Sequence, residues 1–128
     1  MANNDELANA AAQGDMHRMR ELLDQGADPN GINSFDRTPI QVMKMGVPAV
    51  AQLLLERGAD PNRQDSMGMA LIHDVAREGF LDTLQVLVGF GHANPSLRNA
   101  SNHLPVELAS QSGHTDVVRY LDNLPKAE

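Results

Sequence analysis

Apolar residues recur along the chain at helical spacing, in pairs of short segments. The second segment of a pair carries apolar side chains three and four positions apart, as at Met16, Met19, Leu22 and Leu23 and again at Leu81, Leu84, Leu87 and Val88. Such spacing places these side chains on one face of a helix. A short run of small apolar residues precedes each of these segments and ends at a glycine. The pattern predicts paired helices whose shared apolar stripe needs a neighbouring pair to bury it.

The pairs form an internal repeat of about 33 residues. The run Gly26-Ala27-Asp28-Pro29-Asn30 recurs 32 residues later, at 58–62, and a degraded copy follows at 91–95. We expect the glycine of each copy to end the second helix in a left-handed conformation, and the proline to start a turn. The chain is therefore predicted to be one all-α domain. We expect a solenoid of about four helix-turn-helix repeats with short hairpin-like turns, at about 5–32, 33–64, 65–97 and 98–124.

The second repeat departs from the pattern. We call the glycine between the two helices of a pair the inner glycine. The first helix of the second repeat begins at Thr38, eight residues before the inner glycine Gly46, whereas in the third and fourth repeats the corresponding residue lies nine residues before the inner glycine. Thr38-Pro39-Ile40-Gln41 has capping-box spacing with proline at the first helical position, so the helix should start well but span a single turn. The second repeat is expected to be the least stable. Two interpretations remain open: tolerated drift, or a surface reshaped for a partner with adaptable methionines.

Composition narrows the kinds of partner. The 128 residues carry a net charge of −7, and an acidic chain repels phosphate backbones and anionic lipid. We therefore expect no nucleic-acid partner and no membrane, and we favour a protein partner with a basic patch. The chain has no cysteine and starts with a polar, acidic segment that does not read as a signal peptide. A monomer in the cytoplasm and nucleus is expected.

No catalytic or metal-binding pattern stands out. Three histidines, at positions 17, 92 and 103, lack metal-ligand spacing with one another or with carboxylates. The serines and histidines show no elbow or triad signature. We therefore expect no enzyme activity, no cofactor and no metal.

Two longer segments resemble a specific family. Thr38-Pro39-Ile40-Gln41 and the run at 71–74 resemble the ankyrin pattern Thr-Pro-Leu-His. His73 falls on the histidine of this pattern, which in ankyrin repeats bonds to backbone in the turns, so the resemblance implies a structural role for it. Beyond that, residues 37–46 are similar to the shortened second repeat of the ankyrin-type inhibitors of cyclin-dependent kinases 4 and 6, and residues 73–84 match the same family. The resemblance covers nearly the whole chain. It implies a protein that holds the kinase in an inactive arrangement and opposes activation by cyclin D, restraining cell-cycle entry. The alternative is a generic ankyrin scaffold for a different basic protein.

The resemblance also implies a set of partner-binding residues. Asp74 matches a central acidic residue that pairs with a kinase arginine; without the resemblance, a solvated acid at a helix start would be the favoured interpretation. Asp82 matches by position, although it could instead cap the following helix. The complete implied set is Phe35, Arg37, Gln41, Met43, Asp65, Asp74 and Asp82.

Overall fold

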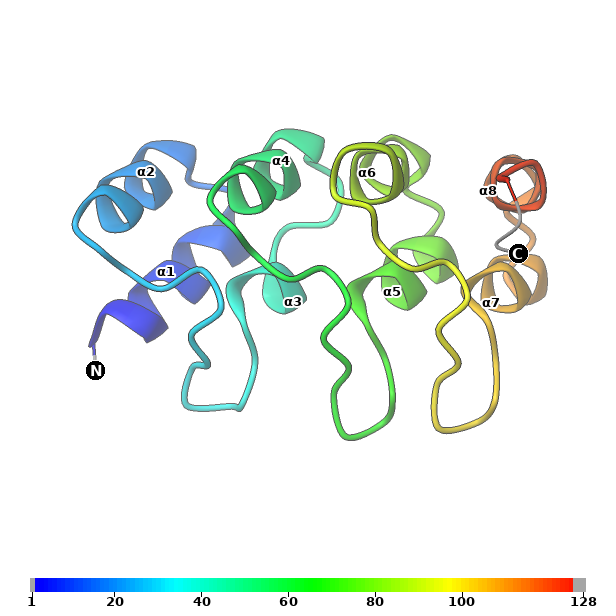
Figure 1. Cartoon of the computed structure of the whole chain (residues 1–128), viewed down its shortest axis with the longest axis horizontal. Helices are drawn as coiled ribbons and strands as arrows, with labels where there is room; N and C mark the ends of the chain where they lie inside the picture. The colour runs from blue at the N-terminus through cyan, green and yellow to red at the C-terminus, as the bar shows by residue number, and fades with distance from the viewer. Residues whose placement is uncertain (1, 126–128) are drawn as a thin grey trace.

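The computed structural model describes residues 2–125, which fold into stacked helix pairs (Figure 1). The helices are α1 (Ala2–Gln13), α2 (Met16–Asp24), α3 (Pro39–Val42), α4 (Pro48–Glu56), α5 (Leu71–Glu78), α6 (Leu81–Gln85), the π-helix η1 (Val86–Phe90), α7 (Pro105–Gln111) and α8 (Thr115–Asp122). The first helices of the pairs form one row and the second helices another. The predicted all-α solenoid is confirmed. No helix among the described residues is both long and apolar enough to cross a membrane.

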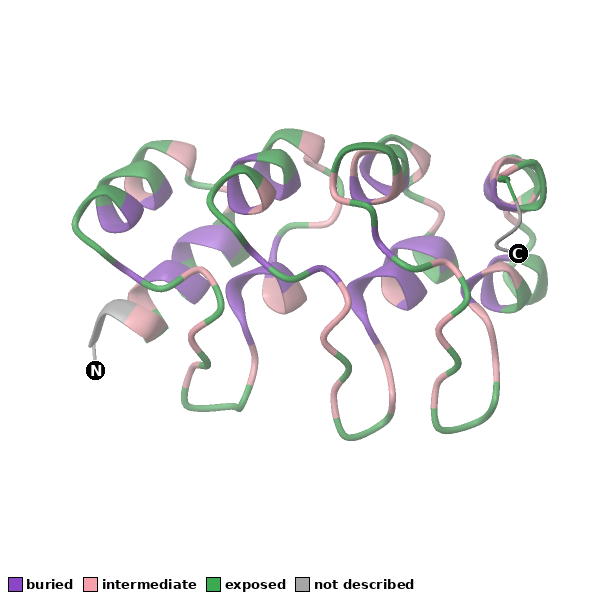
Figure 2. Cartoon of the chain, in the orientation of Figure 1, coloured by how far each residue is buried: buried purple, intermediate pink, exposed green. Residues whose placement is uncertain are grey.

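The core lies between the two rows of helices (Figure 2). The predicted apolar stripes supply it: Met19, Leu22, Leu84 and Leu87 are each at most 1% exposed. Among residues 4–125, three polar side chains are also buried, Thr38, His73 and Thr83. Within residues 4–125 no buried side-chain nitrogen or oxygen lacks a hydrogen-bond partner. This matters because an unpaired buried polar group costs about 1–3 kcal/mol.

Three loops of equal length project from the row of first helices, and we call them fingers. They are residues 28–38, 60–70 and 94–104. In each finger an Asn or Asp side-chain oxygen accepts the backbone N–H groups two and four residues further on, at 2.8–3.0 Å. The accepting residues are Asn33, Asp65 and Asn99. The fourth residue of each turn is left-handed, and these residues are Asp36, Gly68 and Asn102. The fingers therefore share one conformation despite different sequences.

The third residue of the first helix secures the helix start in three repeats. Gln41 Oε1, His73 Nδ1 and Glu107 Oε1 accept the backbone N–H three residues earlier, at 2.9, 3.0 and 2.7 Å. Because Nδ1 of His73 accepts, the ring proton is on Nε2, which donates to the Leu97 carbonyl at 2.8 Å. Gln41 Nε2 donates to the Arg63 carbonyl in the same way, at 3.4 Å. The predicted structural role of His73 is confirmed.

The first helix of the second repeat is as short as its sequence predicts. Helix α3 has four residues, and its N-cap Thr38 is followed by proline at the first position. The capping pattern differs in one detail from the expectation. The Thr38 hydroxyl donates to Gln41 Oε1 at 3.2 Å, while the backbone N–H of Gln41 donates to the Thr38 carbonyl.

The expectation about helix-ending glycines is wrong in the third repeat. Gly26 and Gly58 are left-handed, with φ of 99° and 95°, but Gly91 has φ −88°. His92 takes the left-handed position instead, with φ 55°. The reason is one additional residue between the inner glycine and the buried alanine that follows the helix: 14 positions separate Gly79 from Ala93, against 13 in the first two repeats. Helix η1 absorbs it, because a π-turn accommodates one residue more than an α-turn.

Replacing His92 with glycine is expected to raise the free energy of unfolding by about 1 kcal/mol, because the left-handed conformation strains a side-chain-bearing residue. Denaturant unfolding would measure the change. Gly91→Ala provides the opposite control. An added Cβ at position 91 would lie 2.8 Å from both Leu55 methyl groups and 2.9 Å from the Leu87 carbonyl, so this variant should lose stability. A stabilising Gly91→Ala would contradict this assignment of the two positions.

Candidate functional site

Four charged side chains gather where the second finger meets helix α5. Arg37 Nη2 lies 3.6 Å from Asp65 Oδ2, and Arg77 Nη2 donates to Asp74 Oδ1 at 2.8 Å. Arg37 comes from the first finger, Asp65 from the second, and Asp74 and Arg77 from one face of α5, since they are three residues apart. Both arginines are nearly half exposed. The structure thus brings together three of the predicted site residues, and we call these four residues the acidic–basic cluster.

The surroundings of Asp74 disfavour the ionised form of its carboxyl group relative to water. Its side chain is 27% exposed, and burial raises the pKa of its carboxyl group above the ordinary value. The Arg77 charge opposes this rise, and the Asp65 charge adds to it. The ionised form of Asp74 is therefore disfavoured in the free protein and would gain from an added cation. This describes a residue placed for binding more than for stability.

Asp65 has two separate roles in the structure. Its Oδ1 holds the turn of the second finger, as Asn33 and Asn99 do in their own fingers. Its Oδ2 faces Arg37 across the gap between two fingers, and the side chain is only 13% exposed. An asparagine would suffice for the turn alone. The negative charge is thus an addition specific to the third repeat.

Two exposed apolar side chains occupy the tips of neighbouring fingers. Phe35 is 80% exposed and Met67 is 62% exposed. Each is the second residue after the turn-forming Asn or Asp of its finger. Sequence reasoning identified Phe35 and missed Met67, although alignment of the three fingers on Asn33, Asp65 and Asn99 would have paired them. They expose apolar surface at the tips of the two fingers that also carry Arg37 and Asp65.

The two other predicted residues of the second repeat face inward. Met43 is 3% exposed and belongs to the core, so its assignment as a partner contact is corrected. The cause is the early end of α3 at Val42, after which Met43 leaves the helical conformation, with φ −60° and ψ 158°. Gln41 is partly buried, and its Oε1 also accepts from Arg63 Nη1 at 2.7 Å. Gln41 therefore has a structural role, through which it positions the second finger.

Arg63 is a residue that sequence reasoning missed. Besides Gln41, its guanidinium group bonds to the Asp36 carbonyl at 3.0 Å and pairs with the Asp36 carboxylate at 3.3 Å. It thereby joins the first finger to the second. Nothing in the repeat pattern marks position 63, because the contacts depend on how the two fingers are spaced in the fold.

Asp82 lies apart from the cluster. It follows the C-terminal end of α5, whereas Asp74 is in the first turn of that helix. Its side chain is exposed beside a shallow hollow that Phe80 and Asp116 also line. The alternative role of Asp82 as a helix cap is wrong, because no side-chain cap bond forms at the start of α6. Asp82 could contact only a partner that extends to the inner-glycine loops, which are the short loops between the two helices of each pair, as at Gly46 and Gly79.

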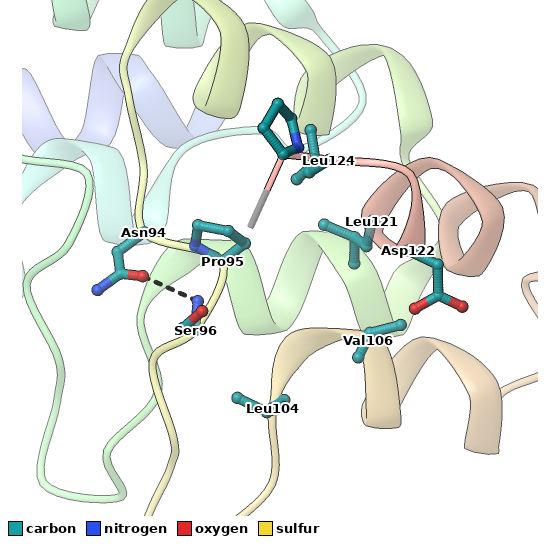
Figure 3. A pocket seen from close by; sticks show the side chains of 9 residues that line it. Asn94, Pro95, Ser96, Leu104, Val106, Leu121, Asp122 and Leu124 are labelled. Atoms are coloured by element: carbon teal, nitrogen blue, oxygen red, sulfur yellow. Dashed lines mark hydrogen bonds between the residues drawn. The ribbon is translucent and has the colours of Figure 1, made fainter. Parts of the chain in front are cut away.

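A second hollow lies between residues 94–96 of the third finger and helices α7 and α8 (Figure 3). Its walls are mainly aliphatic, including Leu104, Val106, Leu121 and Leu124, with Asp122 at one edge. Its polar lining residues are Asn94, Ser96 and Asp122, and Asn94 Oδ1 already accepts the Ser96 N–H at 2.9 Å. Among the residues that the structure describes, no three His, Cys, Asp or Glu side chains are grouped to hold a metal ion. The fingers and α5 carry the charged pairs and exposed apolar tips described above, and they form the candidate binding surface.

Comparison with known proteins agrees with this arrangement. A family model described as ankyrin repeats (3 copies) matches residues 7–89 and 40–126. The chain is 53% identical over 117 residues to cyclin-dependent kinase 4 inhibitor B of Bos taurus, covering 91% of this chain and 88% of that protein. It is also 53% identical over 116 residues to the Homo sapiens protein of that name, covering 90% and 83%. Identity to cyclin-dependent kinase inhibitor 2A of Homo sapiens is 53% over 118 residues, covering 91% and 75%.

Proposed function

The chain belongs to the family of ankyrin-repeat inhibitors of cyclin-dependent kinases, and we propose that it inhibits cyclin-dependent kinases 4 and 6 by binding them. It is a regulatory protein rather than an enzyme. It acts as a monomer in the cytoplasm and nucleus, with no nucleic-acid or membrane partner. The generic-scaffold alternative has no observation in its favour.

The acidic–basic cluster is the observation that supports this proposal best. The half-buried carboxylate of Asp74 already pairs with Arg77, and a second cation, an arginine or lysine of the kinase, would stabilise its ionised form further. A partner that also contacts the first two fingers would bury the exposed tips Phe35 and Met67. A rigid row of fingers beside a charged helix face can contact two parts of a partner at once.

Inhibition requires no chemistry from this chain. If the surface fits an inactive arrangement of the kinase better than the active one, binding shifts the population toward the inactive arrangement. The same difference in affinity lowers the affinity of the kinase for its activating cyclin D, because coupling between two binding sites is reciprocal. The consequence for the cell is restraint of entry into the division cycle.

A titration against purified cyclin-dependent kinases 4 and 6, each with and without cyclin D, tests the proposal. We expect saturable one-to-one binding, loss of kinase activity with the same midpoint, and weaker binding when cyclin D is already bound. A related kinase of a different cyclin class serves as the control. Absence of saturable binding to both kinases would exclude the proposed function.

The family resemblance implies that the Asp65 carboxylate contacts the kinase directly. Asp65→Asn should therefore weaken binding to the kinase about tenfold, which is about 1.4 kcal/mol, while thermal unfolding stays within about 0.5 kcal/mol of the parent. The asparagine keeps the turn bonds, as positions 33 and 99 show, and removes only the charge that faces Arg37. Asp65→Ala is the matched control and should lose stability as well as binding. Equal instability of the two variants would mean that the charge itself holds the finger.

A further inference from the structure

We propose that Asn30 is a site of spontaneous deamidation that the contact between the first and second repeats holds in check. Asn30 is the only asparagine of the chain that is followed by glycine. Imide formation requires the next backbone nitrogen to reach the asparagine side chain, and glycine hinders this least because it lacks Cβ and is conformationally free. Asparagine is also among the thermally labile residues. The reaction needs only water.

The reaction proceeds in two balanced steps. The backbone nitrogen of Gly31 loses its proton and attacks Cγ of Asn30; the new N–Cγ bond forms, the Cγ–Nδ2 bond breaks, and ammonia leaves. Water then adds to one of the two imide carbonyls, and the carbon–nitrogen bond at that carbonyl breaks. One outcome is an aspartate with the original backbone. The other is an isoaspartate whose main chain runs through the former side chain.

In the folded chain both reacting groups are already occupied. Asn30 Nδ2 donates to the Gly58 carbonyl at 2.9 Å, and Asn30 Oδ1 accepts the Asp60 N–H at 2.7 Å. The attacking nitrogen of Gly31 donates to the Asp28 carbonyl at 3.0 Å. Deamidation therefore requires a local opening that releases Asn30 from the second repeat. The rate of the reaction then reports how often this junction opens.

Once formed, the product would keep the junction weakened. A carboxylate has no donor for the Gly58 carbonyl and would place an oxygen against it at a position now 2.9 Å away. The shortened helix α3 belongs to the repeat that loses this contact. Deamidation of Asn30 would thus cause a lasting loss of stability in the first two repeats.

Asn62 provides an internal comparison. It occupies the same position one repeat later, where its Oδ1 accepts the Asn94 N–H at 2.8 Å. It is followed by Arg63 rather than glycine. Among the described residues its amide nitrogen has no hydrogen-bond partner. A carboxylate at position 62 would keep the one contact that the asparagine makes.

Peptide mapping by mass spectrometry tests the site. The intact protein is incubated in mildly alkaline buffer at body temperature and digested with trypsin, which yields residues 21–37 and 58–63 as separate peptides. We expect modification at Asn30 and not at Asn62, about tenfold or more slower than in a synthetic peptide of residues 21–37. Gly31→Ala should suppress it; the added Cβ meets only the side-chain end of Asn4, at 2.6 Å. Equal modification of the two asparagines, or equal rates in the protein and the peptide, would overturn the proposal.

Product mimics test the consequence without relying on the reaction rate or on the kinase. Asn30→Asp should lower the thermal midpoint by a few degrees, whereas Asn62→Asp should leave it nearly unchanged. Equal shifts for the two variants would show that the Asn30 amide does not hold the junction. Because neither readout involves the kinase, failure here and failure of the proposed function are separable.

Discussion

Asp74→Asn is expected to weaken binding to cyclin-dependent kinases 4 and 6 by about 2–5 kcal/mol, the range for removing one partner of a buried charge pair. The thermal unfolding midpoint of the free protein should not fall. Burial raises the pKa of the Asp74 carboxyl, so the ionised group costs stability, and a neutral amide of the same shape removes this cost. The unfolding midpoint should stay equal or rise slightly. Titration calorimetry and thermal unfolding measure the two effects.

A control variant separates this result from a general loss of charge, and a second variant tests the extent of the contact surface. Asp122→Asn removes one exposed carboxylate at the end of α8, remote from the acidic–basic cluster, and should leave binding unchanged. Asp82→Asn tests whether the partner reaches the inner-glycine loops. If Asp74→Asn reduces stability as much as binding, Asp74 has a structural role instead.

Because the pKa of Asp74 is raised, folding stability and kinase binding should change in opposite directions as pH rises. Between its ordinary value of 3.8 and the higher folded value, the folded state holds more protons than the unfolded state. The contribution of Asp74 to folding stability is therefore present at low pH and lost as pH rises through the folded pKa. Kinase binding should strengthen over the same interval, because the ionised form is the one that pairs with a cation. Asp74→Asn should abolish this part of the pH dependence of binding.

The largest loss of stability is expected from His73→Ala, about 2–4 kcal/mol. The side chain is fully buried and bonds at both ring nitrogens, to the Ala70 N–H and the Leu97 carbonyl. Its removal leaves a buried donor and a buried acceptor without partners, each at a cost of about 1–3 kcal/mol. Urea unfolding would measure the loss as a lower midpoint.

His73→Gln is the matched control for that variant, because the second repeat already uses glutamine at the equivalent position. Gln41 accepts the Thr38 N–H and donates to the Arg63 carbonyl, which are the same two contacts one repeat earlier. The glutamine variant should therefore recover more than half of the lost stability. If it is as unstable as the alanine variant, the histidine ring contributes mainly by filling space.

Much of the fold follows from the repeat, and its departures show where sequence reasoning stops. Counting residues from Thr38 to Gly46 was enough to predict a single-turn α3. The extra residue of the third repeat was also countable, but periodicity does not say whether a helix or a loop absorbs it. The structure places it in η1, and the left-handed position moves to His92.

The candidate site was predictable only in part. The resemblance indicated Asp74 and Asp65, and the structure brings them together with Arg37. Met43 was misassigned because one turn of helix carries no reliable facing pattern, so its burial depends on the backbone after Val42. Arg63 was missed because its contacts link two fingers, and no local pattern encodes them.

In each finger the residue that closes the turn is distinct from the residue at the tip, so the tip can change while the turn is kept. Each turn is closed by bonds from one Asn or Asp side chain to backbone, and none of these bonds involves the side chain at the tip. The tips are phenylalanine, methionine and serine at positions 35, 67 and 101, on one common frame. New partner preferences can therefore arise by single replacements at the tips with little penalty in folding, whereas residues such as Arg63, which joins two fingers, must be kept with their partners.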